Sequence, residues 1–299
     1  MATGLVLVGT DGSWHSTAVL HVAAREASLR GAELAVVTVV REVADPRYSL
    51  TALLAEERRA AEVARWRTGE AVLRVRSRYP GLEVSTHLVR DRDLGWPDEA
   101  VRLGAADLLV LGAHGAHAGP VFGLGTVSRF LLKITACPVL VVPDRRPGVV
   151  SRWDDGGTGG PVLAAVGPAG GEEVLAVARR EAALRGTGVH AVRVIRPGDD
   201  AERVRGEISG LVADVDRSAD GVEVVVETPP GAPADVVLRR AEAFALVVVG
   251  TRGPAALAGL TADSVARAVL DRCPCPVLVV APRTARAPLG PSRPAAPAR

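Results

Sequence analysis

Residues 5–40, LVLVGTDGSWHSTAVLHVAAREASLRGAELAVVTVV, decide the fold of this chain. An apolar run leads through a turn into a segment that ends in Leu-Arg-Gly, and a second apolar run follows. Gly31 stands where a residue in the left-handed conformation would end a helix. The stretch therefore predicts a strand, a helix and a second strand, which is how a parallel α/β sheet begins.

The same pattern returns in the second half of the chain. Residues 162–195, VLAAVGPAGGEEVLAVARREAALRGTGVHAVRVI, run through the same succession of elements and again contain Leu-Arg-Gly. The hexapeptide CPVLVV occupies residues 137–142 and returns at residues 275–280, which is 138 positions later. We infer that one fold unit has been duplicated.

The alternation of strands and helices in each half predicts an α/β protein. We expect two tandem, doubly wound, five-stranded parallel-sheet domains, each with the strand order 3-2-1-4-5. Strands are expected near 5–9, 33–40, 82–89, 107–112 and 138–142, then near 161–166, 189–195, 222–228, 245–250 and 276–281. Helices are expected near 14–30, 50–78, 95–104 and 125–135, then near 172–185, 200–217, 232–243 and 262–272.

Pro, Gly and charged residues mark the predicted domain boundaries. We expect a first domain over 1–143, a linker over 144–160 and a second domain over 161–282. Residues 283–299, rich in Pro, Ala and Arg, are expected to form a disordered tail, because they offer little to bury.

Composition excludes several classes of partner. Aromatic residues make up only 3% of the 299 residues, which argues against a stacking platform for single-stranded nucleic acid. The net charge of +2 comes without a basic stripe, so we expect no nucleic-acid or membrane partner. The N-terminus does not look like a signal peptide, and no apolar run approaches the roughly 20 residues of a membrane helix. With three cysteines in no even framework, we expect a cytoplasmic protein.

Residues 112–126, GAHGAHAGPVFGLGT, follow a predicted buried strand. In open parallel sheets, ligands bind outside the carboxyl ends of the strands at the switch point, where GTDGS at 9–13 should also lie. Gly125 and Thr126 precede a predicted helix, whose free N–H groups and dipole favour an anion. The glycines alone would favour a plain turn, but the duplicated position and the hydroxyl at the helix start favour an anion site.

The spacing Gly112-x2-Gly115-x9-Gly125-Thr126 resembles the nucleotide motif of the universal stress protein family, Gly-x2-Gly-x9-Gly-(Ser/Thr). The segments around it and VGTDGS after the first strand are similar to that family too, and the resemblance covers both halves. It implies an ATP-binding regulatory stress-response protein, with Mg²⁺ or Mn²⁺ held through the phosphates. The nucleotide residues that it implies are Gly9, Thr10, Asp11, Val39, Gly112, His114, Gly115, Gly125, Thr126, Val127 and Ser128.

The resemblance also implies a role for each of these residues. Asp11 would meet the adenine amino group or the ribose, and Val39 would meet the adenine through its backbone. His114 would lie near the phosphates, where it could add charge at low pH. The other residues would line the ribose and phosphates: Gly112 and Gly115 at the ribose and α-phosphate, Gly125, Thr126 and Val127 donating N–H groups to the β- and γ-phosphates, and Thr126 and Ser128 adding hydroxyls.

The second copy departs from this motif. Its first turn, VGPAGGEE, has no counterpart of Asp11, and Asp263 aligns with Gly125, although Gly250, Gly253 and Ser264 remain. A carboxylate repels a triphosphate, so we expect the second domain to bind ATP weakly or not at all. We expect it to pack against the first domain as an internal pseudo-dimer. The apolar fifth strands are the expected edges for this pairing, and a homodimer could follow.

Two other functions stay open at the level of sequence. Neither a Walker A sequence nor a Gly-x-Ser-x-Gly elbow occurs, so we expect no dedicated enzyme. A slow ATPase or adenine-nucleotide hydrolase, with Asp11 orienting a water, is one alternative. A nucleotide-free interaction scaffold is the other, and an unidentified regulatory protein is the expected partner. Cys273 and Cys275 have a spacing that suits neither a redox pair nor a zinc site, and His114 and His117 lack further metal ligands.

Overall fold

A computed structural model describes residues 4–10, 16–40, 49–90, 106–113, 137–143, 160–215, 221–251 and 264–280. The strands in these ranges are β1 (Leu5–Thr10), β2 (Glu33–Val40), β3 (Val84–Arg90), β4 (Leu108–Gly112), β5 (Val139–Val142), β6 (Val162–Ala165), β7 (Val189–Val192), β8 (Val224–Glu227), β9 (Leu246–Gly250) and β10 (Val277–Val280). The helices are α1 (Ser16–Arg30), α2 (Leu50–Arg78), α5 (Gly171–Arg185), α6 (Ala201–Val215), α7 (Pro233–Ala241) and α8 (Val265–Arg272).

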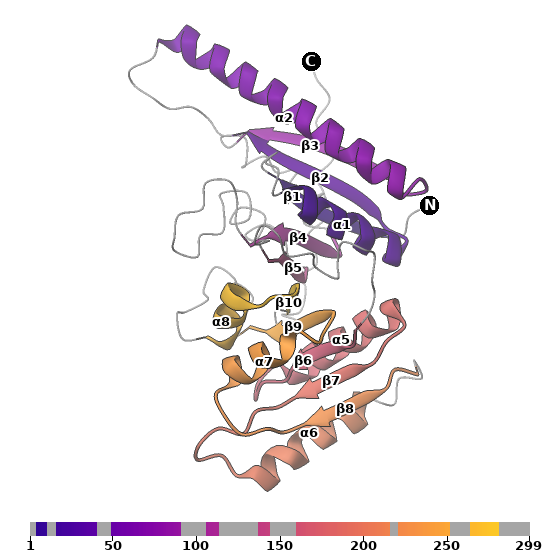
Figure 1. Cartoon of the computed structure of the whole chain (residues 1–299), viewed down its shortest axis with the longest axis vertical. Helices are drawn as coiled ribbons and strands as arrows, with labels where there is room; N and C mark the ends of the chain where they lie inside the picture. Colours follow the sequence, from indigo (N-terminus) through magenta and orange to yellow (C-terminus); the bar gives the residue numbers. More distant parts are fainter. Residues whose placement is uncertain are drawn as a thin grey trace, which may run out of the picture.

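All ten strands lie in one sheet, in the order β3-β2-β1-β4-β5-β10-β9-β6-β7-β8 (Figure 1). Each half therefore has the order 3-2-1-4-5 with parallel neighbours, which confirms the predicted fold class. The apolar fifth strands are the expected edges for pairing of the two halves, and this is confirmed: β5 and β10 pair in antiparallel fashion and join the two five-stranded sheets into one. The expected helices near 95–104 and 125–135 lie outside the described residues.

The β5–β10 pair follows the internal repeat. Leu140 lies opposite Leu278, and these two leucines occupy the same position of the repeated hexapeptide. On either side of this central pair, Val139 lies opposite Val279 and Val141 lies opposite Val277. In both pairs the residue before the leucine in one repeat faces the residue after the leucine in the other. The two halves are consequently related by a local two-fold axis that passes between Leu140 and Leu278. An apolar edge strand of each half is thereby covered by its counterpart.

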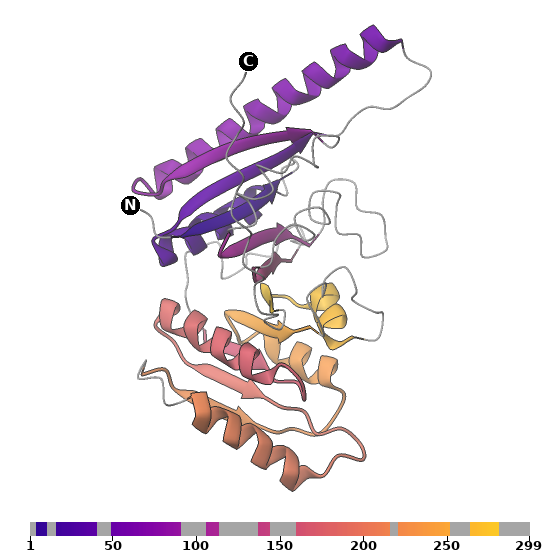
Figure 2. The same ribbon diagram turned by 180° about the vertical axis from the view of Figure 1, so that it is seen from behind.

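Helices cover both faces of the sheet, as Figures 1 and 2 show from opposite sides. Helices α1, α2, α5 and α6 pack on one face, and α7 and α8 pack on the other. Side chains alternate between these faces: Leu140 and Leu278 lie in the core under α1 and α5, whereas Val139 and Val279 lie in the opposite core. Burial on both faces accounts for the unbroken apolar runs of β4 and β9.

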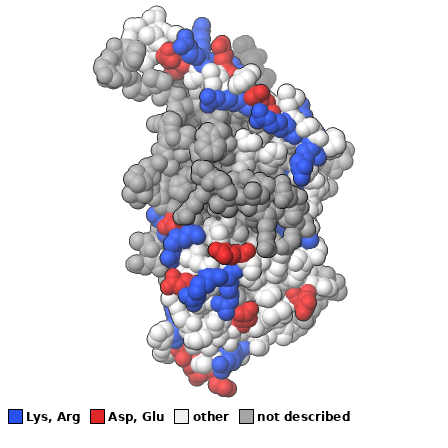
Figure 3. Space-filling model, in the orientation of Figure 1, with Lys and Arg blue, Asp and Glu red and all other residues white. Residues whose placement is uncertain are grey.

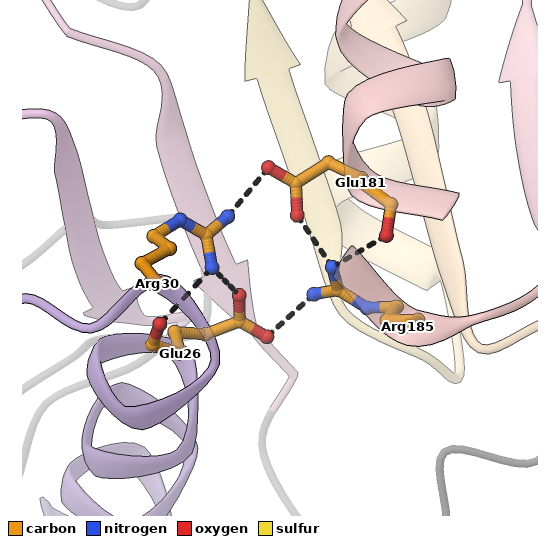
Figure 4. A network of polar contacts seen from close by, with 4 residues as sticks. All are labelled: Glu26, Arg30, Glu181 and Arg185. Atoms are coloured by element: carbon orange, nitrogen blue, oxygen red, sulfur yellow. Dashed lines mark hydrogen bonds and ion pairs between the residues drawn. The ribbon is translucent and has the colours of Figure 1, made fainter. Parts of the chain in front are cut away.

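A ring of four charged side chains joins α1 to α5 (Figure 4). Glu26 pairs with Arg30 within α1, and Glu181 pairs with Arg185 within α5. Between the helices, Arg30 donates to Glu181 at 2.5 Å and Arg185 donates to Glu26 at 2.5 Å. Burial disfavours the charge of Arg30, but its two carboxylate partners outweigh burial and raise the pKa of its guanidinium. The closed ring therefore fixes the two halves against each other on this face.

Charged side chains of both signs are interspersed on the surface shown in Figure 3. Among the described residues, oppositely charged side chains also pair along single helices, such as Arg74 with Glu70 on α2 and Arg267 with Asp271 on α8.

Candidate functional site

The candidate site lies where β1, β2 and β4 end. These strands are parallel, so their carboxyl ends share one edge of the sheet. Val8 pairs with Val110, and two residues further on each strand reaches its last residue, Thr10 in β1 and Gly112 in β4. The sequence-predicted residues Gly9, Thr10 and Gly112 therefore lie on neighbouring strands at the switch point of the first half.

Thr10 is the last residue of β1 and lies next to a buried pair of hydroxyl groups that links β2 to α2. It is only 6% exposed and lies opposite Thr38 in β2. The hydroxyls of Thr38 and Thr68 are 2.8 Å apart and both are buried, so this hydrogen bond ties the end of β2 to α2. The pair satisfies two hydroxyls that would otherwise be costly to bury, and it holds this end of the sheet in place.

Val39 lies near the end of β2 and pairs with Val89 of β3. The next residue, Val40, packs with Ala61 and Ala64 of α2. The backbone of Val39 is thus held between a neighbouring strand and a packed helix, at the same edge as Gly9 and Gly112. The other predicted site residues, Asp11, His114, Gly115, Gly125, Thr126, Val127 and Ser128, lie outside the described residues.

The equivalent edge of the second half has the same backbone geometry. Gly112 lies opposite Val142 in the first half, and Gly250 lies opposite Val280 in the second. The next N–H group bonds to the neighbouring carbonyl in both cases, at 2.8 Å from Ala113 and 3.0 Å from Thr251. The duplication has therefore preserved the end of this strand down to its hydrogen bonds.

Gly250 has a packing role of its own. A Cβ atom at this position would lie 2.9 Å from the Cγ2 atom of Val174 in α5, closer than real contacts allow. The absence of a side chain lets the helix approach the strand end. This glycine is consequently explained by packing, without any ligand.

The helices that follow the first strand of each half differ in charge. The first turn of α5 contains Glu172 and Glu173, whereas the first turn of α1 contains no acidic residue. Carboxylates at a helix N-terminus interact favourably with the helix dipole and oppose the binding of another anion. The pair is visible in the sequence as VGPAGGEE, and the predicted helix over 172–185 already places it in a first helical turn, which the helix start at Gly171 confirms.

Ser264, the counterpart of Thr126, serves the second half as a helix cap. Its hydroxyl accepts a hydrogen bond from the backbone N–H of Arg267 at 3.1 Å, and α8 begins at the next residue. This is the usual role of serine at the N-cap position. In the second half, therefore, this hydroxyl accepts a hydrogen bond from a free backbone N–H group of its own helix.

The part of the chain that the structure describes contains neither a candidate metal site nor a candidate membrane-spanning helix. Its His, Cys, Asp and Glu side chains form no group of three or more that could hold a metal ion. None of its helices combines the length and the apolar character that crossing a membrane requires.

Comparison with known proteins places both halves in one family. The model of the universal stress protein family matches residues 4–143 and again residues 160–281. A universal stress protein of Mycobacterium tuberculosis is 31% identical over 92% of this chain and 96% of its own length. Another, of Mycolicibacterium smegmatis, is 29% identical over 93% of this chain and 97% of its own.

Solved structures agree on the fold. The crystal structure of a universal stress protein from Archaeoglobus fulgidus matches with a TM-score of 0.64 at 20% identity, over 94% of this chain and 99% of that one. A putative universal stress protein from Pseudomonas aeruginosa matches with a TM-score of 0.58 at 18% identity, over 93% of both chains. The repeated family match and the whole-length relatives lead to one conclusion: the chain belongs to the universal stress protein family, as a tandem member with two copies of the domain.

Proposed function

We propose that this protein is an ATP-binding regulatory protein of the stress response, in which the first half holds the nucleotide and the second half serves as its internal partner. The proposed domains are residues 1–143 and 161–282, joined by a linker over 144–160. The proposed contacts are Gly9, Thr10, Asp11, Val39, Gly112, His114, Gly115, Gly125, Thr126, Val127 and Ser128.

The difference in charge between the two helix starts carries this proposal. The first turn of α1, the helix that follows β1, contains no acidic residue, so no carboxylate in that turn opposes an anion. The first turn of α5 contains Glu172 and Glu173, and Asp263 stands where the first half has Gly125. The second half therefore has carboxylates at the helix start and at the counterpart of Gly125, where the first half has none, which favours one nucleotide per chain.

The ends of the strands support the adenosine part of the proposal. Gly9, Val39 and Gly112 lie at one edge of the sheet, on three adjacent strands. Because Thr10 is buried, its contribution to a ligand would come through its backbone. A divalent cation, Mg²⁺ or Mn²⁺, would be bound through the phosphates. Binding would then change a surface that a regulatory partner, or a second copy of the chain, contacts in the cytoplasm.

Titration calorimetry of nucleotide-stripped protein with ATP and Mg²⁺ tests this function. We expect about one ATP per chain, since only the first half lacks the opposing carboxylates. Gly125→Val should abolish binding, because its side chain would occupy the place of a phosphate. Asp263→Val places the same residue at the equivalent position of the second half and is the matched control, with unchanged affinity and stoichiometry.

The opposite results are equally informative. Binding of two ATP per chain would contradict the proposal that the second half holds no nucleotide. Unchanged affinity in Gly125→Val would refute the phosphate position. No binding by the unmodified protein would leave the interaction scaffold as the better function. Phosphate release that is lost in Asp11→Ala would instead indicate a slow hydrolase.

A further inference from the structure

We propose that Cys273 and Cys275 form a reversible intramolecular disulfide when a hydroperoxide reacts with them, which makes this thiol pair a redox modification site of the second half. The sulfur atoms lie 3.6 Å apart in the reduced protein. A disulfide has a bond of about 2.05 Å, so the sulfurs must approach by about 1.5 Å. The proposal is independent of nucleotide binding.

Local backbone geometry brings the two thiols together. Helix α8 ends at Arg272, and Cys273 is its C-cap, with an extended backbone at φ −68° and ψ 131°. The N–H of Cys273 donates to the carbonyl of Val269 at 2.8 Å, which fixes the position of this residue on the helix. The chain then bends at Pro274 and Cys275, and this bend leaves the two sulfur atoms 3.6 Å apart. Cys275 therefore faces Cys273 across the intervening Pro274, and this geometry argues against the expectation from spacing alone that the two residues suit no redox pair.

The two thiols are equally buried but differ in how readily they ionise, so that one suits the role of nucleophile and the other that of resolving thiol. Both side chains are buried, at 5% and 4% exposure, in the core under α7 and α8. The hydrogen bond from Cys275 lowers the pKa of the Cys273 thiol. The same bond, together with burial, raises the pKa of the Cys275 thiol. Cys273 is accordingly the sulfur that ionises first and attacks an oxidant, since the thiolate is the reactive form.

The chemistry balances with a hydroperoxide as the only oxidant. The Cys273 thiolate attacks the terminal oxygen, the O–O bond breaks, and the alkoxide or hydroxide that leaves takes up a proton. The product is a sulfenic acid at Cys273. The sulfur of Cys275 then attacks the Cys273 sulfur, the S–O bond breaks, and hydroxide leaves with the proton of Cys275 as water. Two thiols and one hydroperoxide thus give a disulfide, an alcohol or water, and a second water.

The first half lacks this pair and supplies an internal control. Cys137 corresponds to Cys275 in the repeat, but Thr135 stands where the second half has Cys273. All three cysteines are unbridged in the structure, and Cys137 lies before β5, in the other half of the sheet. A bridge between Cys273 and Cys275 would connect the end of α8 to the segment that enters β10, the strand at the junction of the two halves.

Treatment of the folded, full-length protein with excess hydrogen peroxide tests the proposal. The protein is then denatured, alkylated, digested with trypsin and analysed by mass spectrometry. The tryptic peptide 273–283 contains both cysteines, and Cys137 falls in a different peptide. We expect that peptide to lose two hydrogen atoms and escape alkylation, so that alkylatable thiols fall from three to one. Dithiothreitol should restore all of them.

Three variants make the result decisive. Cys137→Ser should still form the bridge. Cys275→Ser should not, and its Cys273 should accumulate a sulfenic acid that dimedone traps. Cys273→Ser should react far more slowly with peroxide than Cys275→Ser, because it lacks the ionising thiol. Any of three results would overturn the proposal: thiols that stay unchanged in the folded protein, a bridge that forms only in urea, or a bridge to Cys137.

Discussion

The guanidinium of Arg185 lies 2.5 Å from the carboxylate of Glu26, a residue of the other half of the molecule. Arg30 and Glu181 repeat the contact in the reverse direction, so each helix both donates to and accepts from its counterpart. Glu26 and Arg185 are each only 1% exposed, which places this pair among buried ion pairs, where the loss of one partner is costly.

Glu26→Gln should destabilise the whole chain. The substitution leaves Arg185 and Arg30 with one carboxylate between them in a buried site, and removal of one member of a buried pair costs about 3–5 kcal/mol. Urea unfolding followed by circular dichroism measures the change. The exposed pair of Glu70 and Arg74 offers the control, since its carboxylate is 45% exposed. Glu70→Gln should change the unfolding free energy by about 0–1 kcal/mol. Equal effects of the two substitutions would show that the ring contributes no more than a surface pair.

The first half alone should form a dimer through β5. In the full chain β5 pairs with a strand of the same sequence, with Leu140 opposite Leu278. A fragment of residues 1–143 exposes this edge, and a second fragment can supply the missing strand in the same register. Sedimentation velocity should give twice the monomer mass. Leu140→Lys in the fragment should prevent the pairing, because like charges would then face each other across the axis. A monomeric unsubstituted fragment would contradict this expectation.

Two glycines should respond to alanine in opposite directions. Gly250→Ala places a Cβ atom 2.9 Å from Val174, and such overpacking costs about 1–3 kcal/mol. Gly206 lies inside α6 with nothing within 4 Å of a Cβ atom. Gly206→Ala should stabilise the protein by about 0.5–1 kcal/mol, because alanine loses less backbone entropy in a helix. Thermal unfolding of both variants gives the comparison, and the prediction fails if the two shifts share a sign.

Glu227 should contribute stability that acid removes. Partial burial opposes its charge, but hydrogen bonds and charges from Arg240 and His190 outweigh that effect and lower the pKa of its carboxyl. Since the folded pKa lies below the unfolded one, the contribution is complete above the unfolded value of about 4.3 and disappears as the pH falls through the folded value. His190 lies 3.3 Å from the carboxylate and Arg240 3.0 Å, so both side chains face it.

A pH series of urea unfolding on the unmodified protein and Glu227→Gln measures this contribution. The difference in unfolding free energy should be constant between about pH 6 and 7 and should shrink below about pH 4.5. A difference that grows in acid would reverse the sign and refute the assignment. Because the carboxylate is 35% exposed, the effect should also weaken in high salt.

Much of the fold follows from local signals in the sequence. Alternating apolar runs and Leu-Arg-Gly endings predicted α1 and α5 correctly, and Gly186 does end α5 with a positive φ of 63°. β7 is shorter than predicted, ending at Val192, because beyond it only an isolated bridge joins Ile195 to Pro230. At the candidate site, the sequence correctly predicted Gly9, Val39 and Gly112 at strand ends. Their role in binding stays a prediction.

The sequence by itself determined the elements, their order and the duplication, because strand periodicity, turn glycines and repeats are properties of neighbouring residues. The apolar fifth strands also predicted the edge at which the two copies pair, and β5 and β10 pair there. Only the tertiary structure decided which side chains the helices of the two copies bring together. In the sequence, Glu26 and Arg30 look like an ordinary ion pair one helical turn apart. No neighbouring residue indicates that they have partners in α5. Folding brings residues more than 150 positions apart into one buried ring, since unpaired buried charges are costly.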